Sequence, residues 1–484
     1  MSKNPKYYLK PGQNFKVLTL LAFSFLFCQS IFSQFYWQRI YERNSQLVGN
    51  DMCKTSDGNF VITGATLIPN IGYSVFVMKI NDSGDTIWTR TIPNAPNKND
   101  NATVISATTD GGVVIAGQSD TAWACKLDIN GNIIWNKKYL LFSRFSEDII
   151  LTNDNGFLIC GYINDLPAPA FIFKIDSAGS LIWDKTFTYQ FMKVFYSIAQ
   201  HNSGFILTGF ETLSIGLPSN LIVFCINNNG DSLWQKTYNG LQGREIIKLN
   251  QNYYIGCEYA DSIYAQMSFM KINLNGDSIY TRKFSDYGRN NFYACFNIVN
   301  NRLVFTYERD SSFGITQGIG LLSDTMGNII NKVVFTNSNF RWGALRAIVP
   351  ISNGNILFGG TAQMLPLETR VIYCVKTDSL LNTSEFIGIN LISSNIPNLF
   401  VLKQNYPNPF NPVTNIKFEI PRTANIKIAV YDMLGREVDI LVNGKMEAGT
   451  YNASWNAMPY SSGVYFYRFT SDDFISVKKM ILIK

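Results

Sequence analysis

The chain has 484 residues, of which 46% are hydrophobic and 16% are charged. This composition supplies enough apolar surface for a large core and excludes an intrinsically disordered chain. Aromatic residues reach 14% and glycine occurs 35 times, which together favour strands joined by tight turns. Because His201 is the single histidine, a multi-histidine metal site is excluded.

The first 33 residues have the organisation of a secretory signal peptide. A lysine-rich start leads into an apolar run from Val17 to Phe32, and Ser33 follows. The run is short for a membrane span, so we predict that residues 1–33 are removed and that no transmembrane span remains in the mature chain. An uncleaved anchor and lipidation at Cys28 are the alternatives. The lysines of this segment supply most of the net charge of +6, so the mature chain lacks the basic surface of a nucleic-acid binder.

Seven cysteines follow the signal segment: Cys53, Cys125, Cys160, Cys225, Cys257, Cys295 and Cys374. They are odd in number and show no close ligand spacing, which argues against a disulfide framework or a metal site. Most stand inside apolar runs. We therefore predict that they are small buried hydrophobic residues.

An internal repeat of about 48 residues organises the region up to Asn382. Its first signature is an Asp/Asn turn with glycine, followed by an aromatic residue four positions after the glycine. The clear copies of this signature end at Trp88, Trp135, Trp183 and Trp234, and weaker ones at Tyr280 and Asn331. A second signature, in phase with the first, is a turn and then an apolar strand. Its seven copies end near Gly64, Gly117, Gly161, Gly209, Gly256, Thr306 and Gly359.

Each repeat contains four short segments with strand composition, bounded by Gly, Asn and Asp. In the second repeat they are roughly 87–92, 103–109, 113–118 and 122–128. Four strands at this period predict the blade of a β-propeller, and seven repeats predict seven blades. The strand of Trp37 has no local partner. We expect it to pair with the last repeat, around residues 355–378, and to close the ring.

The repeated tryptophans are predicted to pack between blades, because a residue that every blade needs is structural more often than it is a ligand contact. The Asp/Asn turns lack the spaced acids of a calcium loop and are interpreted as hairpin turns. His201 lies in such a turn and is interpreted as a solvated residue.

Two connections in each repeat are tight turns and the other two are longer and differ between copies. The tight turns should share one face of the propeller and the long loops the other, where binding residues are expected. The candidate contacts on the loop face are Arg144, Tyr162, Tyr287, Arg341 and Trp342. No acid pair, nucleophile or ligand set recurs among them, so the sequence indicates no catalytic residue, no cofactor and no metal.

After Asn382 the repeat stops. Residues 386–401 are predicted to be a linker, and residues 402–484 a small Ig-like β-sandwich of alternating strands. The residues that stand out are Tyr406, Pro407, Asn408, Pro409, Phe410, Gly435, Gly463, Tyr465, Lys478 and Lys479.

These motifs, in this order, resemble the C-terminal sorting domain of the bacterial type IX secretion (por) system. The resemblance implies a Gram-negative cell, the secretion machinery as a partner, and a protein that is secreted or held on the outer-membrane surface. A plain adhesive β-sandwich is the alternative. The resemblance leaves open whether the sorting domain is cleaved and how the cargo is anchored.

The repeats themselves are similar to the tryptophan docking motif of quinoprotein-like propellers, although the Asp stands three residues before the Gly rather than four. A sialidase-type Asp box fits less well, since its glycine lies three residues before the aromatic residue and here the gap is four.

The sequence therefore predicts an all-β chain: a signal peptide (1–33), a seven-bladed β-propeller (34–385), a linker (386–401) and a sorting domain (402–484). We expect a monomer whose propeller binds an extracellular glycan or protein. A secreted hydrolase or a quinone-dependent enzyme that uses the loop face is the alternative.

Overall fold

The computed structural model describes residues 36–484 except 43–44, 93–99, 119–120, 140–143, 215–217, 261–264, 285–289, 311–315, 336–339, 365–368, 384–388, 394–396, 447, 458–459 and 472. The predicted signal peptide and Tyr287 lie outside the described residues. Within the described residues the chain is β structure apart from one short 3-10 helix, Ser352–Gly354.

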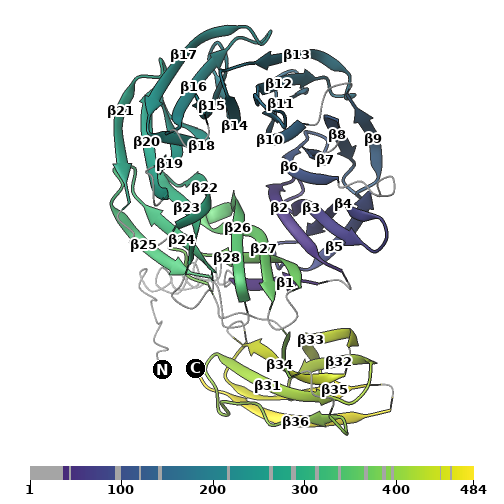
Figure 1. Cartoon of the computed structure of the whole chain (residues 1–484). Coiled ribbons are helices and arrows are strands. Elements are labelled where there is room, and N and C mark those ends of the chain that lie inside the picture. Colours follow the sequence, from purple (N-terminus) through teal and green to yellow (C-terminus); the bar gives the residue numbers. More distant parts are fainter. Residues whose placement is uncertain are drawn as a thin grey trace, which may run out of the picture.

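The described strands up to Thr377 form seven antiparallel sheets of four strands each, arranged around a ring (Figure 1). Blade 1 contains β2 (Leu47–Lys54), β3 (Phe60–Ile68), β4 (Gly72–Ile80) and β5 (Thr86–Ile92). Blade 2 contains β6 (Asn101–Ala107), β7 (Val113–Gln118), β8 (Trp123–Leu127) and β9 (Ile133–Lys138). Blade 3 contains β10 (Arg144–Leu151), β11 (Phe157–Ile163), β12 (Ala170–Ile175) and β13 (Leu181–Phe187). Blade 4 contains β14 (Met192–His201), β15 (Gly204–Thr212), β16 (Asn220–Ile226) and β17 (Ser232–Asn239).

The remaining blades keep the same strand order. Blade 5 contains β18 (Leu241–Leu249), β19 (Asn252–Ala260), β20 (Ala265–Asn273) and β21 (Ser278–Lys283). Blade 6 contains β22 (Asn290–Val299), β23 (Arg302–Asp310), β24 (Thr316–Ser323) and β25 (Ile329–Val334). Blade 7 contains β26 (Phe340–Pro350), β27 (Ile356–Met364), β28 (Arg370–Thr377) and β1 (Trp37–Tyr41). The predicted seven-bladed propeller is confirmed.

Hydrophobic clusters between neighbouring blades hold the ring together. The described residues form seven such clusters, each made by the facing sides of two adjacent blades. The middle strands of a blade are covered on both faces, and every residue of β12 and β15 is buried. This explains why most residues of these strands are apolar, without a regular alternation of apolar and polar positions.

The first strand of the propeller closes the ring, as predicted. β1 pairs antiparallel with β28, from Trp37 opposite Lys376 to Tyr41 opposite Ile372. Figure 1 shows this purple strand beside the green strands of blade 7. Closure is also supported between blades 7 and 1, where the hydroxyl of Thr361 accepts the N–H of Gly49 at 2.9 Å. The ring therefore leaves no open edge between its first and last blades.

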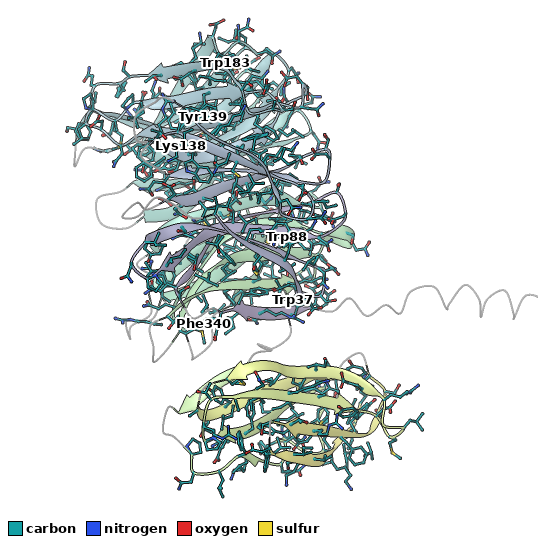
Figure 2. All side chains as sticks on the ribbon, turned by 90° about the vertical axis from the view of Figure 1, so that its right-hand side faces the viewer. Trp37, Trp88, Lys138, Tyr139, Trp183 and Phe340 are labelled. Carbon is teal, nitrogen blue, oxygen red and sulfur yellow. The ribbon has the colours of Figure 1, made fainter. Side chains whose placement is uncertain are left out.

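The repeated tryptophans pack between blades, which confirms their structural role. The indole of Trp88, on blade 1, covers Gly131 of blade 2 so closely that a Cβ at that glycine would lie 2.9 Å from the ring. Its Nε1 donates to the carbonyl of Ile129 at 3.1 Å. Gly131 has a φ of +79°, which glycine adopts without strain. Trp37, Trp135, Trp183 and Trp234 cover Gly84, Gly179, Gly230 and Gly276 in the same way. Figure 2 shows Trp37, Trp88 and Trp183 on separate blades.

The C-terminal part is a sandwich of two four-stranded sheets with its own core. One sheet has the order β29 (Ile389–Ser393), β34 (Gly449–Asn456), β31 (Val413–Ile420), β30 (Val401–Leu402). The other has the order β33 (Glu437–Met446), β32 (Ala424–Tyr431), β35 (Gly463–Thr470), β36 (Ile475–Leu482).

The predicted linker is corrected in one respect. Residues 386–401 include β29, which pairs with β34 from Ile389 opposite Ala453. The segment INLIS is apolar and β-branched, and β34 leaves one edge open to it. The sandwich therefore begins before residue 402.

Candidate functional sites

A loop at the start of the sandwich holds the first part of the predicted sorting motif. Asn405 is 2% exposed, and its side-chain amide donates to the carbonyl of Pro407 at 3.1 Å and to the hydroxyl of Thr414 at 2.9 Å. Its backbone N–H donates to the hydroxyl of Tyr467 at 2.8 Å. These bonds fix the loop from inside and turn residues 406–409 outward.

The same loop is bonded to the last strand of the chain. The N–H of Phe410 donates to Ile481 at 2.9 Å, and the N–H of Ile481 donates to the Asn408 side chain at 2.9 Å. Phe410 itself is 2% exposed, with its ring 5.6 Å from that of Trp455. The proline-rich motif and the basic end of the chain, about 70 residues apart, therefore form one unit.

The sorting residues divide into buried and exposed ones. Phe410 and Tyr465 are buried, and Tyr465 packs edge-on against Trp455. Tyr406 is 80% exposed, and Lys479 is exposed on β36. Gly435 has a φ of +76° in the turn that joins β32 to β33, where Leu434 is 78% exposed. The exposed members form the part of the motif that a partner could contact.

The propeller has a second candidate site at its centre. The first strand of each blade is its innermost strand and faces the axis of the ring (Figure 1), which we call the central channel. In six of these strands the pairing with the second strand slips by one residue. The bulged residues are Asn50, Thr103, Glu147, Tyr196, Arg244 and Arg346. A bulge leaves its residue out of the ladder and can re-aim its side chain.

Charged groups from separate blades influence one another near the axis of the ring. Burial raises the pKa of Glu147 to about 7, although Arg244 and Arg346 act in the opposite direction. These residues belong to blades 3, 5 and 7, which are not neighbours, and all three stand on innermost strands. Arg244 pairs with Glu258 at 3.1 Å and lies 4.5 Å above the ring of Tyr196. Arg346 donates to the side chain of Asn50 at 3.3 Å.

Behind these residues, three carboxylates join adjacent blades. Asp51 accepts the N–H of Ile105 at 3.0 Å, Asp148 that of Ile198 at 2.7 Å, and Glu245 that of Phe296 at 2.7 Å. Burial raises the pKa of each carboxyl group, although these hydrogen bonds act to lower it. The pKa is about 7 for Asp51, about 6 for Asp148 and about 8 for Glu245. They connect the inner strands of blades 1 and 2, 3 and 4, and 5 and 6.

The sequence did not predict this channel cluster. The sequence does contain a signal for it. At 49–52, 146–149 and 243–246, a small residue is followed by a variable residue, then an acid and then an apolar residue. The variable residue is the bulge and the acid is the connector between blades. Recognising this needs the register of the inner strand, which alternation alone does not show.

The predicted loop-face contacts are not brought together. Arg144 is 1% exposed, forms two bonds to Asp184 at 2.8 and 3.2 Å, and lies 4.5 Å above the ring of Phe171. This interpretation is corrected, because a bidentate pair inside blade 3 holds Arg144 away from solvent. Tyr162 stacks on Phe145 at 5.0 Å. Arg341 is exposed and Trp342 half-buried on β26 of blade 7, where Trp342 forms a parallel bridge to Thr316.

His201 is held in its turn rather than free in solvent. Its Nδ1 lies 2.7 Å from the hydroxyl of Ser203 and its Nε2 lies 3.1 Å from the carbonyl of Leu274. Among the described residues, no group of three or more His, Cys, Asp or Glu is placed to hold a metal ion. The described residues also contain no helix with the length and apolar character of a membrane span.

The fold shows a propeller joined to a sandwich that carries an exposed loop. Residues 404–484 match the family described as the secretion system C-terminal sorting domain. The chain is therefore a β-propeller protein that is exported by type IX secretion, and it is secreted or displayed at the surface of a Gram-negative cell.

The solved structures that match this chain have low sequence identity to it. A protein of unknown function from Bacteroides caccae is 16% identical, with a TM-score of 0.42 over 60% of this chain and 99% of that one. PorZ, a surface component of the type IX secretion system of Porphyromonas gingivalis, is 12% identical, with a TM-score of 0.39 over 89% of this chain and 59% of that one. Hydrazine synthase of Kuenenia stuttgartiensis is 10% identical, with a TM-score of 0.46 over 69% and 96%. A comparison with curated proteins gives no match.

Proposed function

We propose that the propeller is an exported binding module for a glycan or protein and that the central channel is its recognition site. The observation that carries this proposal is a contrast within the repeat. The residues that join the blades recur from blade to blade, whereas the bulged channel residues are Asn50, Thr103, Glu147, Tyr196, Arg244 and Arg346. A rigid scaffold that presents a set of differing polar groups is the usual arrangement of a binding site.

The two arginines determine the kind of ligand. Arg346 is anchored by Asn50, and Arg244 by Glu258 and the ring of Tyr196, so both guanidinium groups are already oriented before a ligand arrives. Planar guanidinium groups suit carboxylates. We therefore propose an acidic ligand: a carboxylated glycan or an acidic side chain of a protein.

The test is binding of the mature secreted chain to polygalacturonate and polyglutamate, with neutral dextran as the reference polymer. We expect binding to one of the acidic polymers, and a loss of about tenfold or more in Arg346→Ala, because a hydrogen bond to a charged group contributes about 1.5–3 kcal/mol. Arg370→Ala, an exposed arginine at the start of β28, is the matched control. Equal affinity of the two variants would contradict the channel site.

A secreted hydrolase is the second candidate, favoured by Glu147. A carboxyl group with a pKa of about 7 can give or take a proton near neutral pH. If the channel hydrolyses a polymer, Glu147→Gln should abolish product release while binding persists. If the native chain releases no product and Glu147→Gln loses binding, the hydrolase is contradicted and the binding module stands as the function.

We also propose the domain organisation that the sequence predicts, with a cleaved signal peptide, a propeller and a sorting domain, the last extended backward to include β29. The mature protein is proposed to be a monomer, and the exposed loop around Tyr406 to contact the type IX machinery.

A further inference from the structure

Two pockets occupy equivalent places on the tight-turn face of the propeller. One lies between blades 2 and 3, has a volume of about 430 Å³ and is lined by Trp135, Asp110, Lys126 and Asn155 among others. The other lies between blades 6 and 7, has a volume of about 120 Å³ and is lined by Asn300, Arg302, Gly354 and Ser379 among others. In each blade the first tight turn joins the first and second strands, and the second tight turn follows the third strand. Each pocket is lined by the first tight turns of two adjacent blades and by the second tight turn of the later blade. We name them the blade 2–3 groove and the blade 6–7 groove.

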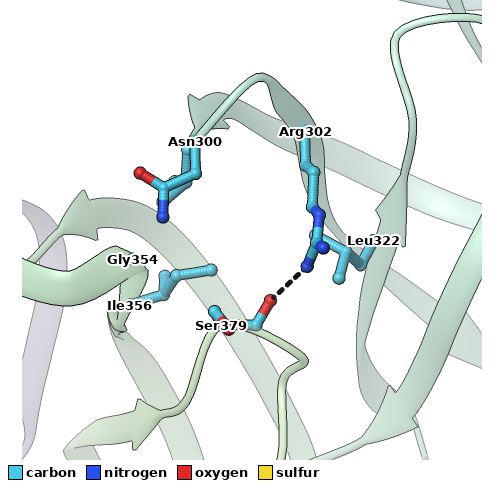
Figure 3. A pocket seen from close by; sticks show the side chains of 7 residues that line it. Asn300, Arg302, Leu322, Gly354, Ile356 and Ser379 are labelled. Atoms are coloured by element: carbon cyan, nitrogen blue, oxygen red, sulfur yellow. Dashed lines mark hydrogen bonds between the residues drawn. The ribbon is translucent and has the colours of Figure 1, made fainter.

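Single residues decide how open these grooves are. In the blade 6–7 groove the side chain of Arg302 crosses the space and donates to the carbonyl of Ser379 at 3.3 Å (Figure 3). Between blades 4 and 5, the Nε2 of His201 lies 3.1 Å from the carbonyl of Leu274, which holds the same turn position as Ser379. Between blades 1 and 2, the second tight turn carries Ile129, whose side chain reaches within 3.2 Å of the Cβ position of Gly111.

The blade 2–3 groove has small residues at these places. Ser177 and Ala178 stand where the preceding blade carries Ile129 and Asn130, so no side chain closes the groove from that turn. Its volume of about 430 Å³ lies in the range of small-ligand pockets, roughly 300–1,000 Å³. The grooves between blades 1 and 2, 4 and 5, and 6 and 7 each hold a larger side chain at this place, whereas the blade 2–3 groove does not.

The lining combines an aromatic surface with paired polar groups. Trp135 is half-exposed and is fixed by its Nε1, which donates to the carbonyl of Ser177 at 3.2 Å. Lys126 and Asp110 form an ion pair at 2.6 Å, so the groove presents a cation and an anion together rather than a net charge. The amide of Asn155 stands on the opposite side, 3.5 Å from the hydroxyl of Thr109.

We propose that the blade 2–3 groove binds one neutral sugar residue of a glycan. The C–H face of a pyranose ring can pack on the half-exposed indole of Trp135. Its neighbouring hydroxyls both donate and accept, which matches the Asp110 carboxylate, the Lys126 ammonium and the Asn155 amide. A ligand with a net charge would be attracted by one member of the ion pair and repelled by the other, so it would gain little binding energy. The groove lies apart from the channel, so this proposal goes beyond the proposed binding function and does not depend on it.

The test uses saturation-transfer NMR on the mature secreted chain with the methyl glycosides of glucose, galactose, mannose and N-acetylglucosamine. We expect transfer to at least one of them. Ser177→Ile should abolish it, because this change places in the groove the residue that the preceding blade carries, while Trp135 stays in place. Thr325→Ile, at the same turn position between blades 5 and 6, is the matched control and should keep the signal.

The outcomes separate this site from the channel. Transfer to none of the four glycosides, or transfer that survives Ser177→Ile, would overturn the groove. Retention of the glycoside signal in Arg346→Ala supports it, and loss in Arg346→Ala but not in Ser177→Ile would move sugar binding to the channel. If acidic polymers bind through Arg346 and no glycoside binds, the proposed function stands and the groove proposal fails.

Discussion

The carboxylate of Asp51 in blade 1 accepts the backbone N–H of Ile105 in blade 2 at 3.0 Å, close to the wall of the central channel. The same contact recurs two blades later from Asp148 to Ile198, and again from Glu245 to Phe296. At these junctions an acidic side chain of one blade thus accepts a hydrogen bond from a backbone N–H of the next blade. Because partial burial raises the pKa of these carboxyl groups in the folded state, their protonation is linked to the stability of the ring.

The first prediction is that the propeller loses stability as the pH rises from 5 to 8.5. The folded pKa values of Asp51, Asp148 and Glu245 are raised to about 7, 6 and 8, whereas the unfolded values are near 4. Between these limits the folded state binds more protons than the unfolded state, so the free energy of unfolding falls with increasing pH. Thermal melts of the mature chain at intervals of half a pH unit should show the melting temperature decreasing over this range.

Two variants check the assignment. Glu245→Gln should make the melting temperature less dependent on pH between 5 and 8.5, because the amide keeps an acceptor without titrating. Asp57→Asn is the control: Lys79 and neighbouring hydrogen bonds hold the pKa of Asp57 below its ordinary value despite partial burial, so it does not titrate in this range. Equal slopes for native protein and Glu245→Gln would contradict the linkage.

The second prediction concerns the contact between Trp88 and Gly131. In Gly131→Ala the new Cβ would lie 2.9 Å from the indole, at a residue with a φ of +79°. We expect a loss of about 2–4 kcal/mol, from the left-handed backbone of an alanine together with overpacking at the blade junction. Urea unfolding followed by tryptophan fluorescence measures it.

Gly58→Ala separates the two causes. Gly58 has a φ of +83°, and nothing lies within 4 Å of its Cβ position. This variant should lose only the backbone part, about 1–2 kcal/mol. If both variants lost the same amount, the indole contact would contribute nothing to the stability of the ring.

The third prediction concerns ring closure by β1. A mature chain that starts at residue 45 lacks the strand that pairs with β28 and also lacks Trp37, which is fully buried. It leaves an unpaired edge on blade 7, which favours association with other chains. We expect this chain to aggregate, and a chain that starts at residue 34 to be monomeric, in light-scattering chromatography.

Trp37→Ala tests the same contact without removing the strand. It should cost about 3–5 kcal/mol, the usual range for a buried aromatic side chain. Trp135→Ala should cost clearly less, since Trp135 is half-exposed. A chain starting at residue 45 that is as compact and stable as the one starting at 34 would mean that β1 does not close the ring.

The blade architecture could be predicted because its determinants are local and repeated. A turn glycine with a tryptophan four residues later marks four of the outer strands, weaker copies mark two more, and the absence of a partner for Trp37 pointed to closure. The channel could not be predicted, because a one-residue bulge such as Glu147 changes the direction of a side chain without changing the composition of the strand. Arg144 was misassigned because its partner, Asp184, lies 40 residues further along the chain. β29 was missed because a five-residue strand with its partner about 60 residues away leaves no periodic signal.

The last prediction concerns export. Deleting the sandwich should leave the propeller in the periplasm, because the matched sorting domain occupies residues 404–484. The deletion should begin after Thr383 rather than at residue 402, since β29 would otherwise remain as an unpaired strand. Cell fractionation with the native chain as reference measures the effect, and equal surface or medium levels of the two proteins would refute it.

Point variants then distinguish recognition from folding. Tyr406 is 80% exposed, so Tyr406→Ala should lower export with the sandwich still folded. Phe410 is buried against Trp455, so Phe410→Ala should lower both export and stability, by about 3–5 kcal/mol in a melt of the sandwich transition. Lys417→Ala, an exposed residue on β31 outside the sorting motif, is the control and should change neither. If Tyr406→Ala were exported like the control while Phe410→Ala was retained, the machinery would depend on the folded sandwich rather than on the exposed face of the loop.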